Sequence, residues 1–244
     1  MSILSSILTP IWRVLFQPRC GVCRERLAEG QHFVCTQCRF DMAMTGFQSR
    51  EFNPMAQRAQ SIRPQIAHAS ALIYYDDGGW RAMIHRMKYK GEWISAWLMG
   101  RWLGEELARS PLYADIDLVI GVPLHPRRQL SRGYNQSHYI ALGVARSMGI
   151  SCSSRGIRRV RYNTSQVRVE RSERWRNVES LFEITNPKIF EHRRVLIVDD
   201  VYTTGATMLS CAEAILDGVP TATVSIATVA ISRHEYGIDE YRQR

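Results

Sequence analysis

The residues with the clearest chemical meaning are two adjacent carboxylates, Asp199 and Asp200, which follow an apolar run at 195–198. Four apolar residues in succession predict a buried strand, and open α/β sheets place ligands at the carboxyl ends of such strands. Small hydroxyl residues and a glycine come next, before a helical pattern at 206–218. Their backbone N–H groups, at a helix N-terminus, would form an anion site. These residues are Thr203, Thr204, Gly205, Ala206 and Thr207.

The acid pair and the anion site cannot hold the same group, because like charges repel. The carboxylates suit a neutral polyol a few ångströms from the anion, or a metal ion. A phosphate held beside a diol is a ribose 5-phosphate. The alternative is a helix capped by threonine, with both aspartates merely solvated. The sequence contains neither a Gly-rich P-loop nor a GxGxxG motif, the rival phosphate-binding signatures.

Strand and helix patterns alternate from about residue 69 onward, which is typical of parallel α/β folds. The crossover rule then predicts an open, mostly parallel sheet with helices on both faces. We expect an N-terminal part at 1–64, whose segment 41–64 is a linker with some helix, and a main domain at 65–244. The expected strands lie at 70–75, 116–123, 195–200 and 221–231, and the expected helices at 78–91, 93–110, 138–150 and 206–218.

Four of the six cysteines fall in the spacing C-x2-C-x11-C-x2-C, within a compact unit at about 17–40. This spacing predicts a structural zinc knuckle in which four thiolates leave no open coordination position. Two redox-active CxxC pairs are the alternative, and His32 could replace one ligand. Cys152 and Cys211 lie in apolar surroundings and are expected in the core. The proposed ligands are Cys20, Cys23, Cys35 and Cys38.

The segment VLIVDDVYTTGAT at 195–207 resembles the phosphoribosyl pyrophosphate (PRPP) signature of type I phosphoribosyltransferases. The paired CxxC unit, MIHRMKYKG, VPLHPRRQLSRGYNQS and RVRYNTSQVRVERSERWRNVESLF resemble the ComF family, a competence-associated branch that includes GntX-type proteins. The resemblance implies a type I phosphoribosyltransferase-like fold that binds PRPP with Mg²⁺. In that plan Asp199 and Asp200 hold the ribose hydroxyls and the Thr/Gly loop holds the 5-phosphate.

The same resemblance implies that the loop after the strand at 116–123 holds pyrophosphate. Leu124 and His125 would present backbone amides, and Arg127 and Arg128 would lie beside them. Arginine suits forked contacts with phosphate oxygens. A turn with surface arginines, capped by His125, is the alternative.

The stretch 155–176 carries eight arginines against two glutamates. Its position corresponds to the flexible catalytic loop of type I phosphoribosyltransferases, which closes over PRPP and excludes water. Arg159 and Arg161 begin the family pattern RxRxTxxQxxL, but Asn163 stands where that pattern has threonine. Tyr162 and Trp175 among the arginines would also suit single-stranded nucleic acid. A solvated, charged helix face is the plainer alternative.

Two functions fit these patterns. The first is Mg²⁺-dependent phosphoribosyl transfer to an acceptor that no residue identifies. The second is single-stranded DNA binding during DNA uptake, together with other uptake proteins and with PRPP as ligand or regulator. The 32 Lys and Arg residues exceed the 23 Asp and Glu residues by nine, which is compatible with phosphate-bearing partners.

The composition excludes a membrane-spanning class of protein, because no run of 18 apolar residues occurs. The apolar segment 3–16 lacks a basic start and a cleavage site, so we expect it to dock on the protein as an amphipathic segment. A secretory signal is the alternative reading of 3–16. Without an export signal, we expect a reducing, cytoplasmic compartment.

Overall fold

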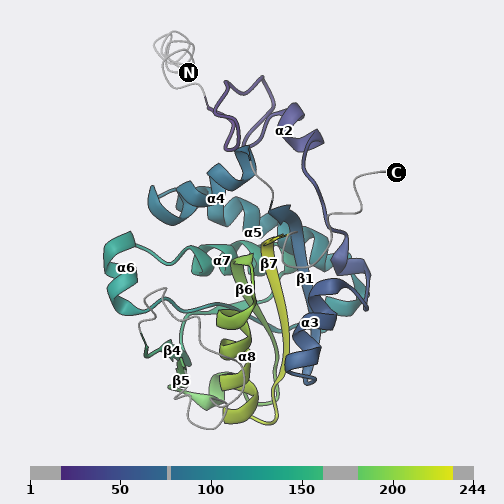
Figure 1. Cartoon of the computed structure of the whole chain (residues 1–244), viewed down its shortest axis with the longest axis vertical. Coiled ribbons are helices and arrows are strands. Elements are labelled where there is room, and N and C mark those ends of the chain that lie inside the picture. Colours follow the sequence, from purple (N-terminus) through teal and green to yellow (C-terminus); the bar gives the residue numbers. More distant parts are fainter. Residues whose placement is uncertain (1–17, 76–77, 162–180, 233–244) are drawn as a thin grey trace, which may run out of the picture.

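A computed structural model describes residues 18–75, 78–161 and 181–232, in which a five-stranded sheet lies between two layers of helices (Figure 1). The sheet has the order β1-β7-β6-β2-β3, and every neighbouring pair is parallel. Its strands are β1 (Ile66–Tyr75), β2 (Leu118–Gly121), β3 (Ser151–Ser153), β6 (Arg194–Tyr202) and β7 (Thr223–Ser232). A separate antiparallel pair consists of β4 (Ile157–Arg159) and β5 (Phe182–Ile184).

The helices alternate with the strands along the main part of the chain. None of the described helices is long and apolar enough to cross a bilayer. The α-helices are α2 (Thr36–Phe40), α3 (Pro54–Ile62), α4 (Gly79–Tyr89), α5 (Trp93–Ala108), α6 (Pro126–Arg132), α7 (Gln136–Met148) and α8 (Ala206–Gly218). The 3-10 turns are η1 (Phe47–Ser49), η2 (Pro111–Tyr113) and η3 (Pro187–Ile189).

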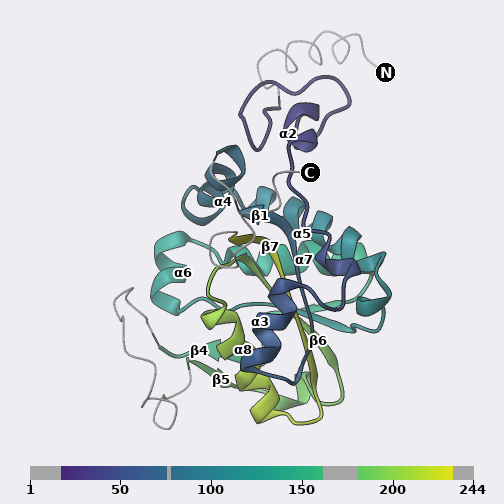
Figure 2. The same cartoon turned by 45° about the vertical axis from the view of Figure 1, so that its right-hand side comes forward.

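The central strand β6 shows why the sheet is covered on both faces. Its side chains alternate between the faces, so Val195 and Ile197 enter one apolar core while Leu196 and Val198 enter the other. Helices α3 and α8 cover the first core, as Figures 1 and 2 show, and α4, α5 and α7 cover the second. The predicted fold class, a mostly parallel sheet with helices on both faces, is confirmed.

Helices α5 and α7 pack closely because glycines lie where they cross. A Cβ on Gly100 would overlap the backbone of Ile140, and one on Gly143 would overlap the carbonyl oxygen of Trp97. Gly121, the last residue of β2, lies in the same way against the backbone of Ser137 at the start of α7. These contacts bring the N-terminus of α7 against the carboxyl end of the sheet.

The segment 41–64 is more than a linker. It contains α3, whose Met55, Ala56 and Ala59 are fully buried in the core beside β1. Asn53 makes this possible, because its side chain accepts from the Ala56 amide and donates to the carbonyl of Ala69. A polar cap that also ties the helix to a strand leaves no periodic signal in the sequence, so the core role of 41–64 was missed.

The basic loop predicted after β2 also contains a helix, α6. Pro126 at its first turn is preorganised for helix, the His125 side chain accepts from the Arg127 amide, and Gly133 ends the helix with φ +79°. Cys211, which was expected in the core, is buried, as are Met83, Met87 and Met99. Cys152 is only partly buried, because β3 is at the edge of the sheet.

Candidate functional site

A cavity of about 190 Å³ opens at the carboxyl ends of β2 and β6, where the N-termini of α7 and α8 converge. This is the edge at which parallel sheets bind ligands. Four regions far apart in the sequence contribute to it: α4, the segment after β2, the end of β4 and the β6–α8 connection. Its lining residues are Lys88, Val122, Leu124, Arg128, Arg132, Gln136, Ser137, Arg159, Asp199, Asp200, Val201, Tyr202, Thr203, Thr204, Gly205, Ala206, Thr207 and Met208.

The acid pair forms one wall of the cavity. Asp199 Oδ1 accepts hydrogen bonds from Ser137 Oγ at 2.5 Å and from the Asp200 amide at 2.9 Å. Asp200 is only 3% exposed, and its Oδ1 lies 3.1 Å from Lys88 Nζ. Its Oδ2 is buried with no hydrogen-bond partner among the described residues. A buried acceptor without a partner is costly, so this oxygen is suited to a ligand's donor.

The environment of Asp199 opposes its ionisation. Burial, together with the neighbouring negative charge of Asp200, raises the pKa of Asp199 to about 6. Hydrogen bonds from Ser137 and the Asp200 amide, together with the charge of Lys88, act in the opposite direction. The cavity therefore holds two carboxylates that gain from hydroxyl donors or from a cation.

The Thr/Gly loop lies next to the acid pair. Thr203 and Thr204 are exposed, and Gly205 begins α8 in the left-handed conformation with φ +78°. A Cβ at Gly205 would overlap the ring of Tyr202, so only glycine fits there. The amides that follow stand at the N-terminus of a 13-residue helix, where the backbone N–H groups and the helix dipole favour an anion.

The cavity also has a basic lining. Arg128 and Arg132 come from α6, and the Arg132 guanidinium lies over the Tyr89 ring at 4.9 Å from its centre. Arg159, at the end of β4, is 93% buried against the Phe182 ring, and burial lowers its pKa. An arginine stays charged in proteins even so. Cations and carboxylates thus line the same cavity, which is large enough for a small phosphorylated molecule.

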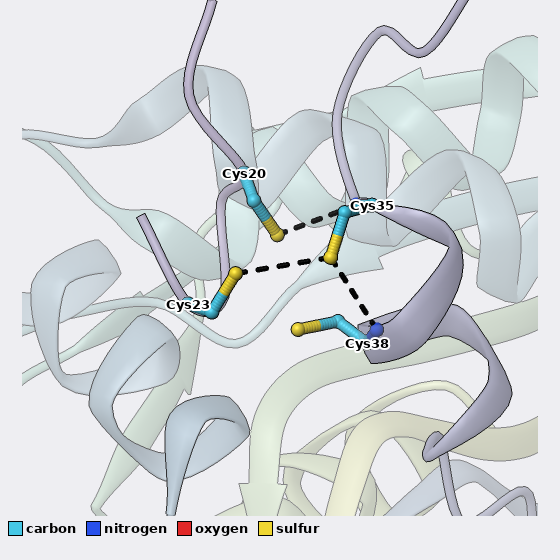
Figure 3. Close-up of side chains that lie close together, drawn as sticks. All are labelled: Cys20, Cys23, Cys35 and Cys38. Atoms are coloured by element: carbon cyan, nitrogen blue, oxygen red, sulfur yellow. Dashed lines mark hydrogen bonds between the residues drawn. The ribbon is translucent and has the colours of Figure 1, made fainter. Parts of the chain in front are cut away.

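A second cluster lies at the N-terminal end of the described chain. The sulfur atoms of Cys20, Cys23, Cys35 and Cys38 lie within 4.8 Å of one another and point toward a common centre (Figure 3). The Cys23 and Cys35 sulfurs are 3.7 Å apart. A tetrahedral site with Zn–S bonds of about 2.3 Å would hold its sulfurs about 3.8 Å apart. The cluster could hold one metal ion.

The backbone around this cluster supports thiolate ligands. The amides of Val22 and Cys35 donate to the Cys20 sulfur. Burial alone would raise the pKa of Cys20, but backbone N–H groups outweigh it and lower the pKa to about 6. Burial and the neighbouring thiols raise the pKa of Cys38. Four thiolates so close together repel one another, and a cation at their centre would remove that repulsion.

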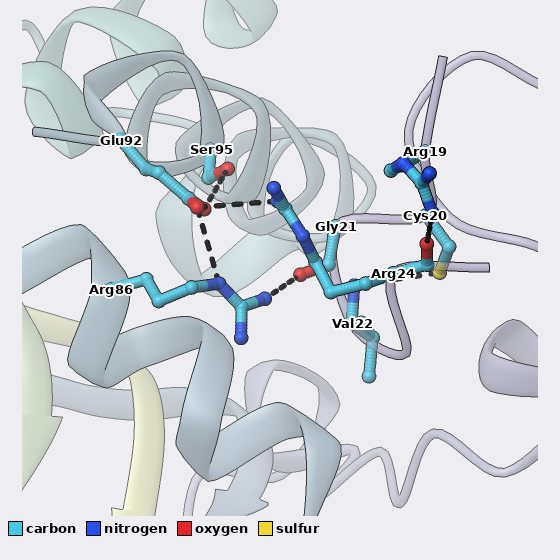
Figure 4. A network of polar contacts seen from close by, with 8 residues as sticks. All are labelled: Arg19, Cys20, Gly21, Val22, Arg24, Arg86, Glu92 and Ser95. Carbon is cyan, nitrogen blue, oxygen red and sulfur yellow. Dashed lines mark hydrogen bonds and ion pairs between the residues drawn. The ribbon is translucent and has the colours of Figure 1, made fainter. Parts of the chain in front are cut away.

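The knuckle, residues 18–40, is tied to α4 and to the start of α5 (Figure 4). Arg86 donates to the carbonyl of Gly21 in the first CxxC turn, and its Nε lies 3.1 Å from Glu92. Arg24 of the knuckle reaches the same Glu92 at 3.2 Å. Val22 packs so closely on Gly79 that a Cβ there would overlap it. The knuckle and α4 therefore share one packed interface.

Comparisons with known proteins agree with this geometry. The phosphoribosyl transferase domain matches residues 129–242. The DNA utilization protein YhgH of Salmonella typhimurium is 31% identical over 203 residues, which cover 81% of this chain and 83% of that protein. The chain belongs to the ComF family of type I phosphoribosyltransferase-like proteins.

Other relatives are similar over most of their lengths. Competence protein F of Haemophilus influenzae is 26% identical, covering 79% of this chain and 88% of that protein. Competence protein ComFC of Bacillus subtilis is 24% identical, covering 89% of this chain and 88% of that protein. The match to YhgH of Salmonella typhi covers 60% of that protein. Among solved structures, the glutamine PRPP amidotransferase of B. subtilis has a TM-score of 0.41 at 21% identity, over 59% of this chain and 30% of that one.

Most of the site residues predicted for this ComF-family chain line the one cavity. The acid pair, the whole Thr/Gly loop, Leu124, Arg128 and Arg159 are brought together. His125 and Arg127 are not among the lining residues, and His125 instead caps α6. Arg161 accepts from Arg159 through its carbonyl oxygen and does not line the cavity either. The rest of the predicted catalytic loop, 162–176, lies outside the described residues, as does the segment 3–16.

Four polar lining residues were missed: Lys88, Arg132, Gln136 and Ser137. All four fall in segments that carry the family resemblance, MIHRMKYKG and VPLHPRRQLSRGYNQS. No separate sequence signal marks these four residues, because each reaches the cavity only through helix packing. The contact of Ser137 with Asp199 joins residues 62 positions apart.

We expect Asp199→Asn to stabilise the ligand-free protein at neutral pH. An amide carries no charge to desolvate, and its oxygen still accepts from Ser137 and the Asp200 amide. The folded-state pKa of Asp199 lies above its ordinary value of 3.8, so its ionisation opposes folding increasingly as pH rises from about 4 to 6. The gain in unfolding free energy should approach about 3 kcal/mol at pH 7 and vanish near pH 3.5.

Urea denaturation at both pH values measures this difference. Asp217→Asn, at the exposed end of α8, is the matched control and should change stability little at either pH. An equal effect of Asp199→Asn at pH 3.5 and pH 7 would contradict the electrostatic origin.

Proposed function

We propose that this chain binds PRPP and catalyses Mg²⁺-dependent phosphoribosyl transfer to an acceptor still to be identified. The observation that carries the proposal is the single cavity in which an acid pair, an anion-binding helix N-terminus and buried or half-buried arginines face one another. A ribose ring carrying a 5-phosphate and a pyrophosphate needs all three. The family membership supports the same assignment.

The acid pair would hold the ribose. Asp200 Oδ2, the buried acceptor without a partner, would accept a hydroxyl hydrogen bond, and Asp199 lies beside it for the second hydroxyl. The 5-phosphate would then sit against the amides and hydroxyls of 203–207. The two subsites are adjacent because β6 runs directly into this loop.

The reaction would break the bond between ribose C1 and pyrophosphate and form a bond from C1 to the acceptor nucleophile. Positive charge develops on the sugar ring while negative charge develops on the leaving pyrophosphate. Arg128, Arg132 and Arg159 are placed to stabilise that negative charge, and the protein's main contribution is orientation. Mg²⁺ bound with PRPP would add charge neutralisation, and the carboxylates of the cavity are oxygen donors of the kind it prefers.

Calorimetry with PRPP and Mg²⁺ tests the binding step. Wild type should bind, and Asp199→Asn/Asp200→Asn should lose at least about 10-fold in affinity, since a hydrogen bond to a charged group contributes about 1.5–3 kcal/mol. Asp217→Asn should bind as wild type does. Retained affinity in the double variant would overturn the assignment of the ribose site.

Pyrophosphate release from PRPP, measured across candidate acceptors, tests the transfer step. Release that depends on one acceptor and disappears in the double variant supports transfer. Release that needs no acceptor, or that the double variant retains, argues against a transferase.

We also propose that the four-cysteine cluster binds one structural Zn²⁺ in the cytoplasm. Purified protein should contain one zinc per chain, and Cys20→Ser or Cys35→Ser should lose it and lower the melting temperature. Cys152→Ser, outside the cluster, is the matched control and should keep the metal. Metal analysis and thermal denaturation measure both effects. A metal-free protein with two disulfides would support the redox alternative instead.

A second candidate function is binding of single-stranded DNA during DNA uptake, with other uptake proteins as partners. The names of the relatives, which concern DNA utilization and competence, favour it, as does the basic stretch at 155–176. If four arginines contact phosphates, affinity should fall about 50-fold between 50 and 200 mM salt. Replacing Arg168, Arg171, Arg174 and Arg176 by alanine should remove most of the binding, measured by fluorescence anisotropy. Binding that survives high salt or these changes would contradict this role.

A further inference from the structure

Lys88 is the only residue of α4 among those that line the cavity, and it makes a specific contact there. Its Nζ lies 3.1 Å from Asp200 Oδ1, and the two side chains are 25% and 5% exposed. The contact joins helix α4 to the end of β6 across 112 positions of the sequence. It is therefore a tertiary contact at the centre of the ribose subsite and not a surface ion pair.

A carboxylate as buried as Asp200 requires a counter-charge, since an unpaired buried charge is strongly disfavoured. Lys88 supplies it at one oxygen only. The other oxygen, Oδ2, keeps no partner among the described residues. The ion pair thus fixes which oxygen of Asp200 has a partner in the protein and which is left as a buried acceptor.

The position of Lys88 is set by a rigid helix turn. Met83, Ile84 and Met87 of α4 are fully buried. The Tyr134 hydroxyl donates to the carbonyl of Met87, one residue before Lys88, and Arg86 is held by Gly21 and Glu92. These contacts anchor the last turn of α4 from both the cavity side and the knuckle side, so Lys88 is directed at Asp200 without relying on a flexible loop.

We propose that Lys88 is a positioning residue of the ribose subsite: it orients Asp200 so that Oδ2 faces the sugar, and it supplies a positive charge beside the acid pair. This role rests on the proposed function, because it assumes a phosphorylated pentose in the cavity. Lys88 acts through Asp200, so removing it should weaken recognition of the sugar while sparing recognition of the phosphate.

The pH dependence follows from the charges around the pair. Lys88 on α4, Arg128 and Arg132 on α6 and Arg159 on β4 line the same cavity, and Asp199 also lies near the Cys211 thiol on α8. Of the cations, Lys88 makes the close contact with Asp200. Lys88 is among the groups that lower the pKa of Asp199. Without it that pKa rises, so sugar binding should weaken most at mildly acidic pH and recover as pH rises.

The experiment compares wild type, Lys88→Met and Lys88→Arg by calorimetry, with ribose 5-phosphate and inorganic phosphate as probes, from pH 6 to pH 8.5. Lys90→Met, at the exposed end of α4 and away from the cavity, is the matched control. We expect Lys88→Met to weaken ribose 5-phosphate binding at least about 10-fold near pH 6.5, with a smaller loss at pH 8.5. Inorganic phosphate should bind unchanged, and Lys88→Arg should stay within about 3-fold of wild type. The affinity of each variant is divided by the wild-type affinity at the same pH, so the titration of the ligand's own phosphate cancels.

The outcomes distinguish failure of the proposed function from failure of the role of Lys88. If wild type binds neither PRPP nor ribose 5-phosphate, the proposed function fails, and this role fails with it. If wild type binds and Lys88→Met binds equally at every pH, the proposed function stands and the role of Lys88 is overturned. Equal weakening of both probes, independent of pH, also overturns it, because that indicates a general loss of positive charge. If Lys88→Met does not fold, Lys88→Gln carries the same test.

Discussion

The buried acid pair at the end of β6 is the constraint around which the rest of the structure is arranged. Two adjacent carboxylates in a largely desolvated position require donors and a counter-charge. The Ser137 hydroxyl on α7 and the Asp200 amide donate hydrogen bonds to Asp199, and the Lys88 ammonium on α4 lies beside Asp200. Each donor needs its helix at a fixed distance from the sheet. The glycine contacts between α5 and α7, and between β2 and α7, are the means by which the chain achieves those distances.

The knuckle extends this arrangement beyond the sheet. Its 23 residues are too few to bury a core of their own, so they depend on a shared interface, and a metal ion held by the four cysteines would stabilise them further. That interface is α4, whose buried methionines lie in the same apolar cluster as Cys20 and Val22. A helix that carries a cavity residue is thus packed against the four-cysteine unit. The knuckle contributes to the geometry of the cavity although none of its residues lines it.

The sequence predicted best what is local. Strand β6, the acid pair and the loop before α8 are contiguous, so their chemistry and their placement could be inferred together. The four cysteines were identifiable for the same reason. Ser137 and Lys88 could not be found, because their roles depend on contacts across 62 and 112 positions. Helix α6 and the core role of α3 were missed because side-chain caps at His125 and Asn53 define them, and such caps leave no hydrophobic period.

This division between local and distant residues also bears on specificity. In the proposed function, the acid pair and the Thr/Gly loop would recognise a phosphorylated pentose, which is common to every reaction of that sugar, so they would not select the acceptor. Selection must come from the surfaces that face the ribose from outside β6, namely α4, α6 and the end of β4. Those elements are brought to the cavity by the knuckle interface, by a capped basic helix and by a separate two-stranded ribbon. If the cavity binds the phosphorylated pentose as proposed, the elements around it are the parts of the fold that define what this chain does with that sugar.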